Sequence, residues 1–321
     1  MSFALIINRN ASRLRHNGPI LNALKRVETN ARVFETRSIE ELNRAVQGLG
    51  SAEHPVLFAG GDGTYSNGLT ALTSRFGAQL PAIGFLPCGT VSTIIRNWGF
   101  SGSPLSFIQS VLANAASATP SAINRPTLRV TYEGGERIGF ICGGGLVSSF
   151  FDEYYKGRGP LGYAHAAKIV ARVFVGAPFG TRFSKKILEP VEASLTIDGE
   201  PAKLSRVSVF VASVVPNLGL HMLLTYRAGM GRRGFHLVAS GEGSSELALQ
   251  LPRVVLGGEL TGEHVDQIAS SVRIRLHDRL GFILDGETLD ASEVEIGEGP
   301  SFRLLTPIHS PSEPRVTTHR A

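Results

Sequence analysis

The chain has 321 residues, of which 42% are hydrophobic and 18% are charged, and its formal net charge is +5. This composition is typical of a globular protein long enough for two domains, and it excludes a disordered chain. The mild positive excess suits anionic partners such as nucleotides or an acidic membrane surface. The sequence lacks a basic cluster interleaved with aromatic residues, so we expect no nucleic-acid binding.

The cysteines, Cys88 and Cys142, have no metal-ligand neighbours, which predicts a reduced, cytoplasmic setting. The sequence shows neither a secretory leader nor an apolar run of about 18 residues. A lipid substrate would therefore have to be reached from the aqueous side of a membrane.

The first third of the sequence alternates short apolar runs with helical patterns. The predicted strands are Phe3–Ile7, Arg32–Thr36, Val56–Ala59 and Ala82–Leu86. The predicted helices are Pro19–Glu28, one that Ser38 caps with Glu41 in a capping box, and Tyr65–Phe76. This alternation predicts a doubly wound, mostly parallel α/β domain that binds its ligand at the carboxyl ends of the strands.

The most informative segment is Gly60-Gly61-Asp62-Gly63-Thr64, which joins the third strand to a helix. Its glycines let the main chain approach a ligand closely, and the helix start adds N–H donors suited to phosphate. A carboxylate here would repel phosphate unless a metal or a transferred proton is involved. The loop therefore predicts phosphate chemistry, and a turn in which Asp62 is only a capping residue stays open. The pattern is neither a Walker loop nor a dinucleotide-binding turn.

The composition changes to Ala, Ser, Thr and Pro around Ala115–Pro126, which predicts a linker. Short β signals dominate beyond it, with turns at Gly134-Gly135, Asp198-Gly199 and Asp285-Gly286. The predicted strands are Thr127–Tyr132, Ile138–Cys142, Ala193–Ile197, Val207–Val215, Gly234–Val238, Val272–Leu276 and Phe282–Leu284. The predicted helices are Gly162–Val175 and Ser244–Leu256. We expect an antiparallel β-sandwich domain, followed by a disordered tail from His309.

Four motifs in order resemble those of the diacylglycerol kinase catalytic family, which includes sphingosine and ceramide kinases and, more distantly, NAD kinases. They are Phe3–Ser12, the glycine loop 60–64, Pro87–Arg96 (with Gly89-Thr90) and Asp285-Gly286-Glu287. The resemblance implies a nucleotide-binding kinase domain over 1–122, to which 301–308 return with a strand at Phe302–Thr306. It also implies a lipid-binding β-sandwich domain over 123–300, and 309–321 form the tail.

The resemblance implies ATP and Mg²⁺ as cofactors. The nucleotide-binding residues that it implies are Asn8, Asn10, Ser12, Thr36, Gly60, Gly61, Asp62, Gly63, Thr64, Gly89, Thr90 and Asp285. The implied metal ligands are Asp62 and Asp285. Helix capping by the residues after the first strand, and a solvated surface position for Arg96, stay open.

Three acids are candidate catalytic residues: Glu287 as the first choice for general base, Asp62, and Asp152. Asp152 precedes Leu161-Gly162 with a spacing that resembles a headgroup-binding Asp of sphingosine kinases. The alternatives are a hairpin turn for Asp285-Gly286-Glu287, since Asp198-Gly199-Glu200 repeats the string, and a solvated helix start for Asp152.

The chain departs from the family where relatives carry acids. Asn67 stands where Glu is usual, Ser92-Thr93 replace Asn-Asp, and Gly145-Leu146-Val147-Ser148 replaces a string that ends in Asp-Ala. These changes weaken a simple transfer of the family metal site.

The predicted function is transfer of the γ-phosphate of ATP to a lipid hydroxyl, of diacylglycerol or of a sphingoid base or ceramide. An NAD kinase-like enzyme and a nucleotide- or lipid-binding regulator with weak catalysis are the alternatives. We expect a cytoplasmic protein that associates peripherally with the inner membrane face, and a homodimer stays open. The glycine-rich segment Arg227–Phe235 is a candidate membrane contact or a plain connection between strands.

Overall fold

The computed structural model describes residues 3–16, 18–26, 31–52, 54–156, 165, 168–169, 171–172, 181, 190–219, 222–229, 233–255 and 257–308. The chain divides into two compact units. The α/β unit consists of the described residues of Met1–Arg125 and Ser301–Ala321, and the β unit is Pro126–Pro300. The pair Leu161-Gly162, most of the predicted helix Gly162–Val175 and the predicted tail 309–321 lie outside the described residues.

The described part of the α/β unit contains a six-stranded sheet with the order β2-β1-β3-β4-β17-β5. All neighbouring pairs are parallel except β17 with β5. The strands are β1 (Phe3–Asn8), β2 (Ala31–Thr36), β3 (Val56–Gly60), β4 (Ile83–Pro87), β5 (Ala122–Arg125) and β17 (Phe302–Leu305). The helices are α1 (Pro19–Lys25), α2 (Ile39–Gln47), α3 (Asp62–Phe76), α4 (Thr93–Asn97) and α5 (Pro104–Ala115).

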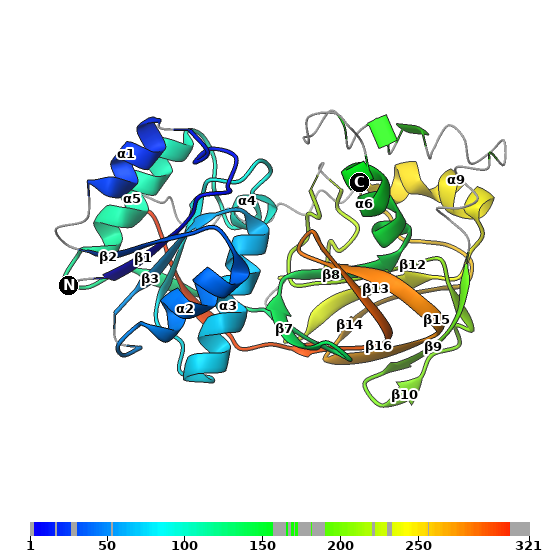
Figure 1. The fold of residues 1–321 in the computed structure, drawn as a ribbon. Coiled ribbons are helices and arrows are strands. Elements are labelled where there is room, and N and C mark those ends of the chain that lie inside the picture. The colour runs from blue at the N-terminus through cyan, green and yellow to red at the C-terminus, as the bar shows by residue number, and fades with distance from the viewer. Residues whose placement is uncertain are drawn as a thin grey trace. The chain divides into compact units, whose positions relative to one another are not determined.

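Helices cover both faces of this sheet: α1 and α5 lie on one side, and α2 and α3 on the other (Figure 1). The predicted α/β architecture is therefore confirmed. Every residue of β3 and β4 is buried, which explains why these strands are continuous apolar runs and not alternating patterns. Burial on both faces fixes where the strands end, and their ends carry the loops described below.

The predicted linker Ala115–Pro126 is wrong in part, because it contains β5. This strand pairs antiparallel with β17 at the end of the sheet. The Asn114 side chain secures both segments, since its amide donates to the carbonyls of Ser121 and Thr306 at 2.7 Å each. The polar composition of a short edge strand concealed this pairing, which joins residues far apart in the sequence.

An antiparallel sheet builds the β unit. Its main order is β14-β13-β12-β8-β15-β16-β6-β7, and β9 joins β15 and carries β10 and β11. The strands are β6 (Leu128–Tyr132), β7 (Gly135–Gly139), β8 (Ile141–Gly145), β9 (Val191–Ile197), β10 (Glu200–Pro201), β11 (Arg206–Val207), β12 (Val209–Ser213), β13 (Phe235–Ser240), β14 (His264–Ala269), β15 (Ser271–Leu284) and β16 (Glu287–Glu298). The predicted antiparallel β domain is confirmed, and its strands form one connected sheet.

The long strand β15 makes this connection. Its first half pairs with β9, its last residues pair with β8, and β16 pairs with both halves. A register shift between Arg275 and Leu280 separates the halves. The sequence indicated two short strands here, because the polar residues of the shifted segment interrupt the apolar pattern.

Two described helices pack on the β unit: α6 (Leu146–Lys156) and α9 (Ser244–Val255). The apolar cluster beneath them joins Leu247 and Val254 of α9 to Val209 and Val211 of β12. No helix within the described ranges is both long and apolar enough to cross a membrane.

Candidate functional site

Three loops meet at the carboxyl ends of β1, β3 and β4. They are the first loop (Asn8–Arg13), the glycine loop (Gly60–Thr64) and the second glycine loop (Pro87–Ser92). The Arg13 N–H donates to the Cys88 carbonyl at 3.1 Å, which joins the first loop to the second glycine loop. The Asn8 amide donates to the Thr64 hydroxyl at 2.9 Å, which joins it to the glycine loop. The three segments therefore form one connected surface.

The two glycine loops pack backbone against backbone. The Gly60 carbonyl accepts the N–H groups of Cys88 and Gly89 at 2.8 and 2.9 Å. A Cβ added to Gly89 would lie 2.6 Å from the Gly61 Cα, so a side chain at this position would force the loops apart. The glycines here serve close packing of the two loops as well as access to a ligand.

The start of α3 presents donors for an anion. The N–H groups of Thr64 and Tyr65 both donate to the Gly61 carbonyl, at 2.9 and 3.2 Å. Those of Asp62 and Gly63, the two residues before them, have no acceptor in the described part of the chain. Unpaired N–H groups and the partial positive charge of a 15-residue helix favour a phosphate at this point.

Both carboxylate oxygens of Asp62 accept hydrogen bonds from the start of α4. Its Oδ2 accepts the Thr93 N–H at 2.8 Å, and its Oδ1 accepts the Ile94 N–H at 3.2 Å. Burial of the carboxyl group raises its pKa, and the two backbone hydrogen bonds oppose that rise only in part. Asp62 therefore makes the contacts of a capping residue, which was the alternative that the sequence left open.

Most of the predicted nucleotide-binding side chains lie together on these loops. The Asn8 side chain accepts the Asn10 N–H at 2.9 Å, the Asn10 amide donates to the Arg37 carbonyl at 2.6 Å, and the Thr90 hydroxyl donates to the Ser12 hydroxyl at 3.2 Å. Thr36 is different: it is 3% exposed, and its hydroxyl donates to the Ile7 carbonyl at 3.3 Å. Thr36 therefore supports β1 from inside the sheet.

Arg96 contacts residues just before and after α4. The sequence had left open whether this residue is functional or a surface charge. Its Nε donates to the Val91 carbonyl at 3.0 Å, and its guanidinium lies over the Phe100 ring. These contacts hold the chain on both sides of α4.

The structure adds Arg13, which the sequence did not single out. Its guanidinium donates to the carbonyls of Pro87 (3.2 Å) and Gly89, so a positive charge lies at the second glycine loop. The only signal in the sequence was a cation a few residues after the first strand. Since a helical surface position explains such a cation equally well, pattern alone could not select it.

Asp285 occupies the turn between β15 and β16, in the β unit. Its backbone is left-handed (φ 49°), and its two carboxylate oxygens accept the N–H groups of Phe140 and Ile141 at 3.0 and 2.9 Å. Asp198, in the repeated string, has the same conformation (φ 51°), and its Oδ1 accepts the N–H groups of Ser270 and Ser271 at 2.9 and 2.8 Å. Both copies are hairpin turns that an aspartate ties to a neighbouring segment.

Glu287 follows the Asp285 turn as the first residue of β16 and is half-buried. The equivalent residue of the other copy, Glu200, is exposed. Asp152, a candidate catalytic acid whose alternative was a solvated helix start, lies inside α6, which begins at Leu146. Its side chain is outside the described part of the structure.

The predicted magnesium ligands, Asp62 and Asp285, are already engaged in hydrogen bonds within their own units. Asp62 and Asp285 belong to different units, and the oxygens of each carboxylate accept backbone N–H groups. In the described ranges, no group of three or more Asp, Glu, His or Cys side chains is placed to hold a metal. A magnesium site needs several oxygen ligands in near-octahedral geometry.

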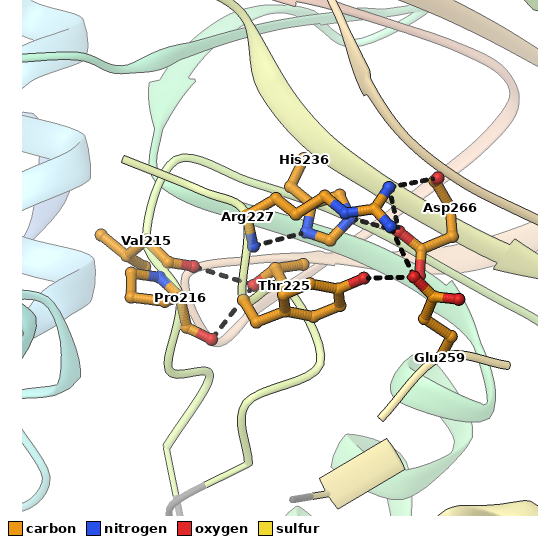
Figure 2. A network of polar contacts seen from close by, with 8 residues as sticks. Val215, Pro216, Thr225, Arg227, His236, Glu259 and Asp266 are labelled. Carbon is orange, nitrogen blue, oxygen red and sulfur yellow. Dashed lines mark hydrogen bonds and ion pairs between the residues drawn. The ribbon is translucent and has the colours of Figure 1, made fainter. Parts of the chain in front are cut away.

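The segment Arg227–Phe235, a candidate membrane contact, starts from a polar network centred on a buried histidine (Figure 2). His236 is fully buried; its Nδ1 accepts the Arg227 N–H at 3.2 Å, so its Nε2 carries the proton and donates to Asp266 at 2.7 Å. The Arg227 guanidinium pairs with Asp266 at 3.2 Å and Glu259 at 2.9 Å. All of these groups are paired with one another, so the network anchors the segment. Met230 and Arg232 lie outside the described residues.

Residues 2–121 match the family model of the diacylglycerol kinase catalytic domain. This confirms the predicted resemblance over that part of the chain, which carries all three loops. The match supports a kinase that uses a nucleotide.

Solved structures resemble the chain over almost its whole length. One is a candidate diacylglycerol kinase from Bacillus anthracis str. Sterne, with a TM-score of 0.70 and 15% identity over 95% of this chain and 96% of that one. Another diacylglycerol kinase from the same organism gives 0.63 and 14% with the same coverage. Yeast NADH kinase complexed with NADH gives 0.50 and 10%, over 95% of this chain and 83% of that one. At these identities the similarity shows the fold. No curated protein matches the sequence.

Proposed function

We propose that this chain is an ATP-dependent lipid kinase, which transfers the γ-phosphate to a lipid hydroxyl. The hydroxyl oxygen forms a bond to the γ-phosphorus, the bond from that phosphorus to the β-phosphate oxygen breaks, and ADP leaves. The hydroxyl proton passes to a carboxylate. Magnesium enters the proposal only with ATP, as a part of the nucleotide substrate.

One observation carries the nucleotide half of the proposal: the N–H groups of Asp62 and Gly63 at the start of α3 have no acceptor in the described part of the chain. They lie on a surface to which Arg13 brings a positive charge. Transfer of a phosphoryl group needs positioning and charge stabilisation above all, and fixed backbone donors supply both. The domain match over 2–121 covers the same loops.

For the proton we propose Glu287. Asp62 is the weaker candidate, because both of its oxygens already accept backbone N–H groups. Asp285, tied to Phe140 and Ile141, fixes the turn that precedes Glu287. A half-buried carboxylate on a fixed turn is suited to accept a proton at a defined position.

The proposed acceptor is diacylglycerol, or a sphingoid base or ceramide, with Asp152 as a candidate contact for the lipid headgroup. A lipid acceptor requires peripheral association with a membrane surface, and the net charge of +5 suits anionic lipids. Exposed Arg233, in the segment that the His236 network anchors, is a candidate contact for those lipids.

A nucleotide-binding regulator without turnover is the second candidate. The observation in its favour is that Asp62 and Asp285, two of the acids shared with the family, both bind backbone N–H groups.

The test is transfer of labelled phosphate from MgATP to a panel of diacylglycerol, ceramide, sphingosine and NAD. A labelled lipid supports the proposal and defines the acceptor, whereas labelled NAD would replace it with an NAD kinase. Binding of ATP without any labelled product would favour the regulator. The variant Glu287→Gln should lose transfer while Glu200→Gln, its matched control in the repeated string, keeps it.

A further inference from the structure

We propose that Asp62 is a positioning residue that clamps the second glycine loop to the glycine loop Gly60–Thr64. The α/β unit would then bind nucleotide without a metal ion held by the protein. The nucleotide half of this inference rests on the proposed function. The clamp itself rests on contacts within the α/β unit alone.

Helix α4 lacks a cap from its own sequence. Ser92, the residue before it, is left-handed (φ 56°, ψ 50°) and makes no side-chain hydrogen bond to the helix. The Ser92 hydroxyl is buried and has no partner in the described part of the chain. The first N–H groups of α4, those of Thr93 and Ile94, bind Asp62 from the other loop instead. A residue 31 positions away thus does what an N-cap residue usually does.

The clamp acts on backbone that has little freedom to adjust. Beside it, the Gly60 carbonyl holds the N–H groups of Cys88 and Gly89, and the loops approach so closely that Gly89 leaves no room for a Cβ. A serine with φ above zero is a strained conformation that the surroundings must impose. Loss of the clamp should therefore release Ser92 and the residues before it, which form one wall of the proposed phosphate site.

The chemistry of the position favours a carboxylate. Two N–H groups converge on it, and an ionised carboxylate accepts both through charge-assisted hydrogen bonds. An asparagine would offer one oxygen and would turn its NH₂ group toward the other donor. The same contacts answer the objection that a carboxylate repels phosphate, because they direct its charge to α4.

The clamp also uses one lone pair on each oxygen of Asp62, so a metal would have to share the carboxylate with two N–H groups. Within the described ranges no other set of side chains is placed to hold one. We therefore expect the protein to bind divalent cations only together with a nucleotide.

The first experiment measures hydrogen exchange in peptides that contain α4, for the wild type, Asp62→Ala and Asp198→Ala. Asp198 is the matched control, since its carboxylate also accepts two consecutive backbone N–H groups, but in the β unit. The clamp predicts faster exchange in α4, by about fivefold or more, for Asp62→Ala alone. Unchanged exchange in α4 would contradict the clamp. If Asp62→Ala does not fold, Asp62→Asn keeps the volume and removes one acceptor.

The second experiment measures the Kd for ADP in EDTA by calorimetry. We expect Asp62→Ala to weaken binding about fivefold, and Asp198→Ala to leave the Kd unchanged although it also lowers the melting temperature. A merely structural role of Asp62 would lower the melting temperature and leave the Kd of the folded protein as it is. If the wild type binds no ADP but Asp62→Ala still speeds hydrogen exchange in α4, the clamp stands and only the proposed nucleotide binding is overturned.

The third experiment counts free Mn²⁺ by electron paramagnetic resonance in the presence of wild-type protein without nucleotide. We expect the protein to leave the signal of free Mn²⁺ unchanged. Stoichiometric Mn²⁺ binding that Asp62→Ala abolishes would show that Asp62 is a metal ligand and would overturn the proposal.

Discussion

Asp62 and Asp285 make the same kind of contact in two different settings. Each carboxylate accepts two consecutive backbone N–H groups from another segment of its own unit. Asp62 does so within three connected loops, next to helix donors that have no acceptor among the described residues. Asp285 does so at a hairpin turn that Asp198 repeats. The contact alone therefore marks structure, and function depends on the groups beside it.

The largest effect is expected where the two hairpins differ, at Glu287 and Glu200. If Glu287 accepts the substrate proton, Glu287→Gln should lower kcat about 10²- to 10⁴-fold, which is typical of a lost general base. Glu200→Gln, on the exposed copy, should leave kcat unchanged. Steady-state phosphate transfer by the two purified variants makes the comparison. Equal activities would mean that the hairpins do not differ in function.

The next effect concerns the packing of the two glycine loops. Gly89→Ala should destabilise the protein by about 1–3 kcal/mol, because its Cβ has no room beside Gly61. It should also weaken ADP binding. Gly50→Ala is the control, since a Cβ there meets nothing within 4 Å. Denaturant unfolding and calorimetry give both quantities, and a Gly89→Ala protein as stable as the control would refute the close packing.

A smaller effect separates the two hairpin aspartates. Asp285→Ala should destabilise the protein by about 1.5–3 kcal/mol, since it removes hydrogen bonds to a charged, half-buried group. Asp198→Ala should cost less, because Asp198 is exposed to water. Urea unfolding of both variants measures the difference. The reverse order would show that burial of the turn does not govern its stability.

The smallest effect is a pH dependence from the His236 network. Burial would raise the pKa of Asp266, but the hydrogen bond from His236 and the charge of Arg227 outweigh it, so the pKa is lowered. A lowered pKa stabilises the fold above the pKa of the unfolded chain, near 4, and this contribution is lost as the pH falls through the folded value. Asp266→Asn should therefore flatten the acid limb of a plot of unfolding free energy against pH. An identical acid limb in both proteins would exclude Asp266 as its source.

The sequence predicted what depends on local pattern. The buried strand Val56–Ala59 and the glycine loop after it were recognisable, because a continuous apolar run and a rare string of residues suffice. The pairing of β5 with β17 was not, since a short polar strand carries no pattern and its partner lies far along the chain. The Asp62 clamp was not predicted for a related reason. The N–H groups that bind its carboxylate belong to residues 31 and 32 positions further along the chain, beyond any local pattern.

The candidate site was predictable to a similar degree. The residues of the first loop, the glycine loop and the second glycine loop do come together, because parallel strands end at one edge of their sheet. Thr36 was selected from its place at a strand end, but its side chain turns into the sheet. Arg13 was passed over, because nothing local distinguishes it from any surface cation.

The decisive measurement is transfer of labelled phosphate from ATP to diacylglycerol, ceramide or sphingosine, with Glu200→Gln and Glu287→Gln in parallel. If the chain is a lipid kinase with Glu287 as its base, we expect one labelled lipid with the wild type and with Glu200→Gln, and almost none with Glu287→Gln. A wild type that binds ATP but labels no lipid, or a Glu287→Gln protein with full activity, would contradict it.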